Sequence, residues 1–115
     1  MTDIYGIKNC DTMKKAFKWL DAHHIDYTFH DYKKGGFDKG LIESAINAHG
    51  WDAVLNKRGT SWRQLPPTIQ SNMDDKKALE IAETNPSIIK RPLLYKDKTF
   101  TIGFSDDKYA KIFNV

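Results

Sequence analysis

Residues 3–31 read DIYGIKNCDTMKKAFKWLDAHHIDYTFHD, and this stretch decides the fold because its pattern changes from strand to helix and back to strand. It opens with apolar, β-compatible residues, and a polar turn containing helix-capping residues follows at 8–12. Apolar side chains then recur at helical spacing from Met13 to about His23, and apolar and polar residues alternate over 25–31. We therefore predict a β-α-β unit whose two strands are parallel and joined by a right-handed connection.

The remainder of the chain predicts a helical middle followed by a hairpin and a last helix. Lys33 to Gly36 break the periodic pattern, and an Asn-Pro pair at 85–86 should end the helical region. The predicted elements are helices over 38–50, 74–84 and 105–113, short turns at 51–55 and 60–65 that end at Pro66-Pro67, and hairpin strands over 93–95 and 99–102.

This order of elements predicts an α/β protein with a four-stranded mixed sheet. We expect one domain over residues 1–115, with a helical insert at about 37–86 between the second and third strands. The topology is that of the thioredoxin and glutaredoxin folds.

Composition narrows the class of protein. The chain has 115 residues, 40% hydrophobic and 29% charged, which is ordinary for one globular domain. No apolar run approaches the ~20 residues of a membrane span, and residues 1–6 lack the features of a signal peptide. We therefore expect a cytoplasmic protein that does not bind or span a membrane. A net charge of +3 is too mild to indicate nucleic-acid binding.

Cys10 is the single cysteine and lies at the predicted N-terminus of the first helix. Backbone N–H groups and the positive end of the helix dipole favour thiolate over thiol at such a position. A thiol with a pKa of about 8.5 is about 3% ionised at pH 7, whereas a pKa of about 6 makes it about 90% thiolate. Cys10 is therefore the candidate nucleophile.

Lowering the pKa that far needs about 3.4 kcal/mol of stabilisation, of which a helix dipole supplies about 0.3–1, or about 2 when partly buried. A nearby cation is therefore required, and Lys8, Arg58 and Arg91 are the candidates. The alternative interpretation treats Cys10 as a small buried apolar side chain and the cations as solvated.

Two interpretations remain open for the Arg91-Pro92 bond, a plain strand-start proline or a cis peptide beside the first helix. Other catalytic motifs are excluded by residue type. A phosphatase loop would need arginine in place of Ala16, and a CxxC disulfide motif would need cysteine in place of Met13. The four histidines lack metal-site spacing and cysteine companions, so we expect no metal.

Three segments resemble the ArsC family of glutaredoxin-linked arsenate reductases, and most closely its YffB/Spx-like branch. They are YGIKNCDT at 5–12, LNKRGT at 55–60 and KRPLL at 90–94, and the resemblance spans nearly the whole chain. It implies a thioredoxin-like fold and a nucleophilic cysteine. The site residues that it implies are Cys10, Arg58 and Arg91 for catalysis, and Lys8, Asn9, Asp11, Thr12 and Pro92, the last as a cis-proline, for substrate binding.

The resemblance and the single thiol together imply a glutathione-dependent thiol reductase. Glutathione would be the cosubstrate, no cofactor would be tightly bound, and a small thiol or oxyanion would be the substrate, with glutaredoxin as a candidate protein partner. Glutathione would resolve the enzyme-linked disulfide because the chain has no second cysteine.

Two alternatives stay open. One is a non-catalytic regulatory protein that binds the transcription machinery as Spx-like relatives do, although Met13 excludes their CxxC redox switch. The other is weak arsenate reduction. Arsenate reductases of this family carry a third arginine after the last strand, and residues 101–105 contain none, which disfavours this alternative.

Overall fold

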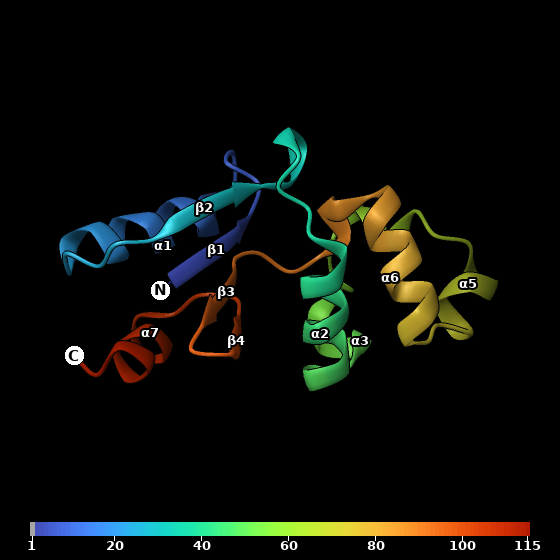
Figure 1. The fold of residues 1–115 in the computed structure, drawn as a ribbon. Helices are drawn as coiled ribbons and strands as arrows, with labels where there is room; N and C mark the ends of the chain where they lie inside the picture. The colour runs from blue at the N-terminus through green and yellow to red at the C-terminus, as the bar shows by residue number, and fades with distance from the viewer. Residues whose placement is uncertain (1) are drawn as a thin grey trace. The chain divides into compact units, whose positions relative to one another are not determined.

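The computed structural model describes residues 2–115, which form two compact units (Figure 1). The sheet unit comprises residues 2–36 and Arg91–Val115, and the helical unit comprises Phe37–Lys90. The sheet unit contains β1 (Thr2–Gly6), α1 (Asp11–Ala22), β2 (Thr28–Asp31), η1 (Tyr32–Lys34), β3 (Leu93–Lys96), β4 (Thr99–Ile102) and α7 (Asp106–Phe113). The helical unit contains α2 (Lys39–His49), α3 (Trp51–Val54), α4 (Thr60–Arg63), α5 (Pro67–Ser71), α6 (Asp75–Thr84) and η2 (Pro86–Ile88).

The four strands form one mixed sheet in the order β2-β1-β3-β4. β1 and β2 are parallel, whereas β3 is antiparallel to both β1 and β4. This confirms the predicted α/β class, the parallel first pair and the thioredoxin/glutaredoxin-like fold with helices inserted between the second and third strands. The hairpin between β3 and β4 turns at Asp97 and Lys98, which both have positive φ, as a tight two-residue turn requires.

Helices α1 and α7 share one core on the sheet. The fully buried side chains of α1 are Met13, Ala16 and Leu20, which recur at helical spacing as predicted. They pack with Ile4 of β1, Leu94 of β3 and Tyr109 of α7. This continuous core holds the N-terminus of α1 against the end of β1.

β2 begins three residues later than the predicted strand over 25–31. The N–H of Ile25 donates to the carbonyl of Leu20, and the N–H of His24 donates to that of Asp21. With His24 at φ 57, these bonds make a Schellman motif, which closes α1 without a glycine. The backbone N–H groups of His24 and Ile25 therefore bond to the end of α1 and not to the sheet.

The helical unit contains one helix that the sequence prediction missed. Pro66-Pro67 ends the predicted turn, but Pro67 is also the first residue of α5, a position where a fixed φ and a missing N–H cost nothing. The two longer helices begin as predicted, because Asp38 accepts a bond from the N–H of Leu41 and Asp74 accepts one from that of Lys77.

The helical unit begins at Phe37, and its last residue is Lys90. The description of residues 1–115 as one domain with an insert at about 37–86 remains a prediction. Within residues 2–115, no helix is long and apolar enough to cross a membrane.

Candidate active site around Cys10

Cys10 is the residue immediately before α1 and forms its N-cap, as predicted. A short loop connects it to β1, so the thiol lies at the carboxyl end of a central strand. Its side chain is half-buried, and it packs against the core that α1 and α7 share. Part of the side chain therefore remains accessible, and the choice between a nucleophile and a small buried apolar side chain stays a prediction.

The surroundings of Cys10 lower the pKa of its thiol below the ordinary value. Burial by itself raises this pKa, but several groups that stabilise the thiolate outweigh it. In decreasing order they are the backbone N–H of Met13, the Arg91 side chain as a hydrogen-bond donor, the backbone N–H of Thr12 and the positive charge of Arg91. The first turn of α1 and one arginine thus act together on the sulfur.

The thiol makes no short capping hydrogen bond of the kind that Asp38 and Asp74 make at their helices. The backbone N–H groups of Met13 and Thr12 nevertheless stabilise its thiolate. Such an interaction grows when the sulfur becomes anionic, because the partial positive charges of the helix end then face a full negative charge.

Arg91 and Pro92 immediately precede β3, whose first residue pairs with Tyr5 of β1. The Arg91-Pro92 peptide bond is cis, which decides between the two interpretations of the sequence. Pro92 is buried, and its carbonyl accepts a bond from the N–H of Gly103 at 2.9 Å. The pairing of Tyr5 with Leu93 therefore places Arg91 at the carboxyl end of β1, the same end of the sheet at which Cys10 lies.

The other predicted site residues of the sheet unit lie around the thiol in the chain. Lys8 and Asn9 are exposed in the loop before it, Asp11 is the exposed first residue of α1, and Thr12 is half-buried. Among the described residues that act on the pKa of Cys10, the cation is Arg91 and not Lys8. Participation of Lys8, Asn9, Asp11 and Thr12 in substrate binding stays a prediction.

Arg58 belongs to the helical unit. It is exposed in the loop between α3 and α4, where its backbone N–H donates to the side chain of Asn56 at 3.1 Å. This bond orders the loop as an Asx turn, a role that the side chain of Arg58 does not share. Its predicted action on Cys10 stays a prediction.

Met13 occupies the position of the second cysteine in a CxxC motif, and its side chain is fully buried. A Cβ atom added to Gly6 would lie only 2.5 Å from the Met13 sulfur, so a larger residue there would force the buried Met13 side chain to move. The contact between Gly6 and Met13 brings the first turn of α1 close to β1. This packing holds in place the N–H groups that act on Cys10.

Tyr32 is a buried residue of the site that the sequence analysis missed. It is 6% exposed, and burial raises the pKa of its hydroxyl, with a further increase from Tyr5 and an opposing effect of the Arg91 charge. The guanidinium of Arg91 thus acts on both Cys10 and Tyr32. Its position in the sequence could have indicated this, because Tyr32 directly follows β2, and the carboxyl ends of the parallel strands β1 and β2 lie at the end of the sheet where the thiol is.

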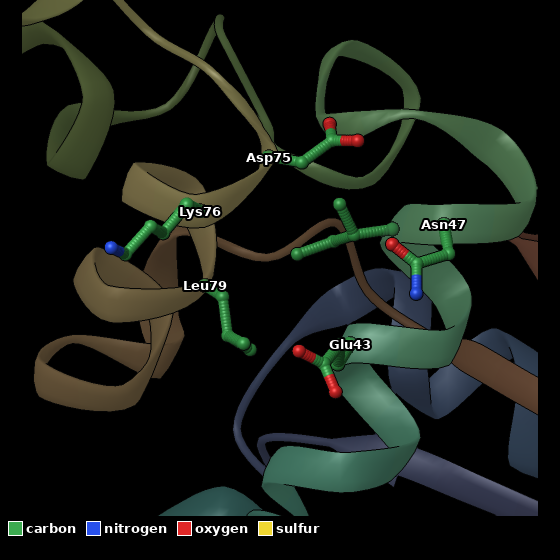
Figure 2. Close-up of a pocket in the computed structure, with 6 residues that line it drawn as sticks. Glu43, Asn47, Asp75, Lys76 and Leu79 are labelled. Carbon is green, nitrogen blue, oxygen red and sulfur yellow. The ribbon is translucent and has the colours of Figure 1, made fainter.

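The helical unit has a pocket of about 240 Å³ between α2 and α6 (Figure 2). Glu43 and Asn47 of α2 lie on one side of it and Lys76 and Leu79 of α6 on the other, with Asp75 at one end. No thiol or arginine lines it, so it adds nothing to the site around Cys10. Within residues 2–115, no three His, Cys, Asp or Glu side chains gather in a metal-binding arrangement.

Comparison with known proteins places these features in a family. Residues 5–112 match the ArsC family. An uncharacterised protein of Haemophilus influenzae is 42% identical over 98% of this chain and 99% of its own. The global transcriptional regulator Spx of Listeria innocua is more distant, with 22% identity over 96% of this chain and 86% of its own.

Two solved structures are similar along nearly their whole length. A YFFB protein is 44% identical with a TM-score of 0.92, covering 96% of this chain and 97% of that one. An arsenate reductase (ArsC) related protein from Brucella melitensis is 46% identical with a TM-score of 0.78, covering 99% of this chain and 95% of that one.

Proposed function

The chain belongs to the ArsC family, and from this premise we propose that it is a glutathione-dependent thiol reductase whose nucleophile is Cys10. The observation that carries the proposal is the lowered pKa of Cys10, which the first turn of α1 and Arg91 produce together. A thiolate is the reactive form in disulfide exchange, so this arrangement prepares the only sulfur that the chain can use as a nucleophilic cysteine.

The first step is attack of the Cys10 thiolate on the glutathione sulfur of a mixed disulfide between glutathione and a substrate thiol. A bond forms between Cys10 and glutathione while the disulfide of the substrate breaks. The substrate leaves as a thiolate and takes a proton from solvent. Cys10 is oxidised and the substrate sulfur is reduced.

In the second step a reduced glutathione attacks the glutathione sulfur that is bound to Cys10. Glutathione disulfide leaves, and Cys10 returns to the thiolate. Overall, one mixed disulfide and one glutathione give one free thiol and one glutathione disulfide, so electrons balance. An external thiol is required because the chain contains one cysteine, and the reducing cytoplasm would supply it.

The residues around Cys10 fit roles in holding such a substrate. Arg91, which already stabilises the thiolate, would also bind a glutathione carboxylate. The backbone near Pro92, just before β3, would pair with the extended peptide of glutathione, with Pro92 beside it. We also assign substrate contacts to Lys8, Asn9, Asp11 and Thr12, and anion binding to Arg58.

The test is mass spectrometry after exposure to glutathione disulfide, followed by a turnover assay with a glutathionylated peptide. We expect one glutathione adduct on Cys10, its removal by reduced glutathione, and turnover that depends on glutathione. The Cys10→Ser variant should show neither the adduct nor turnover. An adduct that reduced glutathione does not remove, or no adduct, would contradict the proposal.

A second candidate function is regulation of transcription without catalysis, which the similarity to Spx favours. In that case the chain should bind purified RNA polymerase, and Cys10→Ser should bind it equally well. Polymerase binding without glutathione turnover would favour this candidate over the reductase. Turnover without polymerase binding would exclude it.

A third candidate is weak arsenate reduction, which the similarity to an arsenate reductase related protein favours. Residues 101–105 supply no arginine, so we expect the oxyanion to lack one of its ligands. The measurement is arsenite formation from arsenate with glutathione and glutaredoxin present. No arsenite at about 1 mM arsenate, a concentration that saturates a typical enzyme, would exclude this candidate.

A further inference from the structure

A second pocket, of about 270 Å³, lies in the sheet unit. It is lined by residues of α1 from Lys15 onward and by the first residue of α7, and Cys10 is not among its lining residues. Lys15 lies more than one helical turn beyond Cys10, about 7.5 Å along the helix axis, so the pocket does not include the thiol. The residues that line it and that matter here are Lys15, Lys18, Trp19, His23, Phe104 and Asp106.

Two aromatic side chains, Trp19 and Phe104, form the apolar walls of this pocket. The His23 ring stacks on Trp19 with centroids 3.9 Å apart, and its Nδ1 lies 2.9 Å from the Trp19 carbonyl oxygen. Tyr109 packs edge-on against both walls, with centroids 5.5 Å from Trp19 and 4.7 Å from Phe104. The walls are therefore held in place before any ligand binds, which lowers the entropic cost of binding.

The charges on the rim favour an anion. Lys15 and Lys18 are exposed on α1, and Asp106 faces them from α7. In the described part of the chain, none of these three side chains forms an ion pair. The negative end of the α1 dipole and the positive end of the α7 dipole meet here and oppose each other. Because the two dipoles oppose each other, the sign of the charge at the rim is set by the side chains, and two lysines against one aspartate make it positive.

We propose that this pocket binds a small organic anion that carries one aromatic ring. A cavity of about 150 Å³ holds a benzene ring, so the volume here is enough for one ring and a short acidic substituent. The ring would pack edge-on or offset against Trp19 and Phe104. The anionic group would lie between the ammonium groups of Lys15 and Lys18.

The test uses phenylacetate as the ligand and the indole N–H signals of the three tryptophans in a ¹H–¹⁵N spectrum at constant ionic strength. We expect the Trp19 signal to shift and saturate with a dissociation constant of about 1–10 mM, as for a ligand of this size. Trp51 and Trp62, which stack on each other in the helical unit, serve as internal controls and should not move.

Two exposed variants with opposite effects make the test specific. Lys18→Gln should weaken phenylacetate binding about two- to fivefold, and Asp106→Asn should strengthen it by a similar factor, as for a partly screened charge. Lys34→Gln removes an exposed lysine of the same unit outside the pocket and should leave the affinity unchanged. Benzylamine, with the same ring and a positive charge, should bind more weakly than phenylacetate.

The proposal is overturned if the Trp19 signal shows no saturable shift up to about 50 mM phenylacetate, a range well above the expected constant. It is also overturned if benzylamine binds as well as phenylacetate, or if Lys18→Gln and Asp106→Asn both bind like the unsubstituted protein. Cys10→Ser should retain binding, so the result is independent of the proposed reductase activity.

Discussion

At the scale of single residues, the accessibility and ionisation of one sulfur decide the chemistry. Cys10 is half-buried, and burial alone would disfavour its anionic form. Arg91 contributes both a hydrogen bond and a charge to the thiolate, while the backbone N–H groups of Thr12 and Met13 are supplied by α1. Of the groups that lower the pKa of Cys10, Arg91 is therefore the one that a single side-chain substitution can remove.

Replacing Arg91 with alanine should raise the pKa of Cys10, because the remaining stabilisation comes from the helix end alone. The measurement is the rate of iodoacetamide alkylation against pH, in which the single cysteine gives one titration. At neutral pH we expect alkylation to slow about three- to tenfold, since solvent screens part of the interaction. The alkylation rate of Arg91→Lys should lie between those of the unsubstituted protein and Arg91→Ala. An unchanged titration of Cys10 in Arg91→Ala would refute the role of Arg91 in stabilising the thiolate.

Tyr109 offers a prediction about stability. Its side chain is fully buried, and its hydroxyl has no hydrogen-bond partner within residues 2–115. Tyr109→Phe should therefore leave the free energy of unfolding unchanged or raise it by about 1 kcal/mol. Tyr109→Ala, in contrast, should lower it by about 3–5 kcal/mol through the cavity it leaves. Urea unfolding followed by circular dichroism measures both, and a clear loss in Tyr109→Phe would show that the hydroxyl is satisfied.

At the scale of elements, the junction of β1 and α1 places the thiol. β1 ends at Gly6, and α1 begins immediately after Cys10. The buried Met13 side chain lies against Gly6, so the first turn of α1 approaches the strand closely. The same junction therefore combines a packing contact with the N–H groups that stabilise the thiolate.

Gly6→Ala should destabilise the protein by about 1–3 kcal/mol, because the new Cβ would overlap the Met13 sulfur. Gly40→Ala in α2 is the matched control: its Cβ would have its nearest neighbour at 3.6 Å, an ordinary contact. That substitution should stabilise by about 0.5–1 kcal/mol through helix propensity. Equal effects of the two alanines in chemical denaturation would argue against the close contact.

At the scale of the whole molecule, the chain leaves the sheet unit after Gly36 and returns at Arg91. The arginine that acts on the thiol is thus the first residue after the helical unit. Its position follows from the sheet register at β3, which belongs to the sheet unit.

The stability of the folded protein should depend on pH through Cys10. Its pKa is lowered on folding, so the ionised thiol contributes stability above the unfolded-state pKa, and this contribution is lost as pH falls through the folded-state pKa. The difference in unfolding free energy between the unsubstituted protein and Cys10→Ser should therefore grow as the pH rises from below the folded-state pKa toward the unfolded-state pKa of about 8.5, and should level off above it. A difference that is flat or shrinks with rising pH in urea titrations would contradict the lowered pKa.

The sequence by itself determined the β-α-β unit, the hairpin, the last helix and the place of Cys10 before α1. These features follow from local patterns, because helical spacing, capping residues and alternation act over a few neighbouring residues. The same locality explains two errors. The closing motif of α1, which delays β2, needed positive φ at His24 rather than at a glycine, and α5 begins at a proline that also ends a turn.

Tertiary structure alone decided which cation acts on the thiol, that the Arg91-Pro92 bond is cis, and that the charge of Arg91 also acts on Tyr32. Lys8 is closer to Cys10 in the chain than Arg91 is, but it is Arg91 that stabilises the thiolate. The reason is that the sheet register brings the start of β3 to the carboxyl end of β1, although Cys10 and Arg91 are separated by 80 residues in the sequence. Contacts over such separations depend on the folded chain and leave no periodic signal in the sequence.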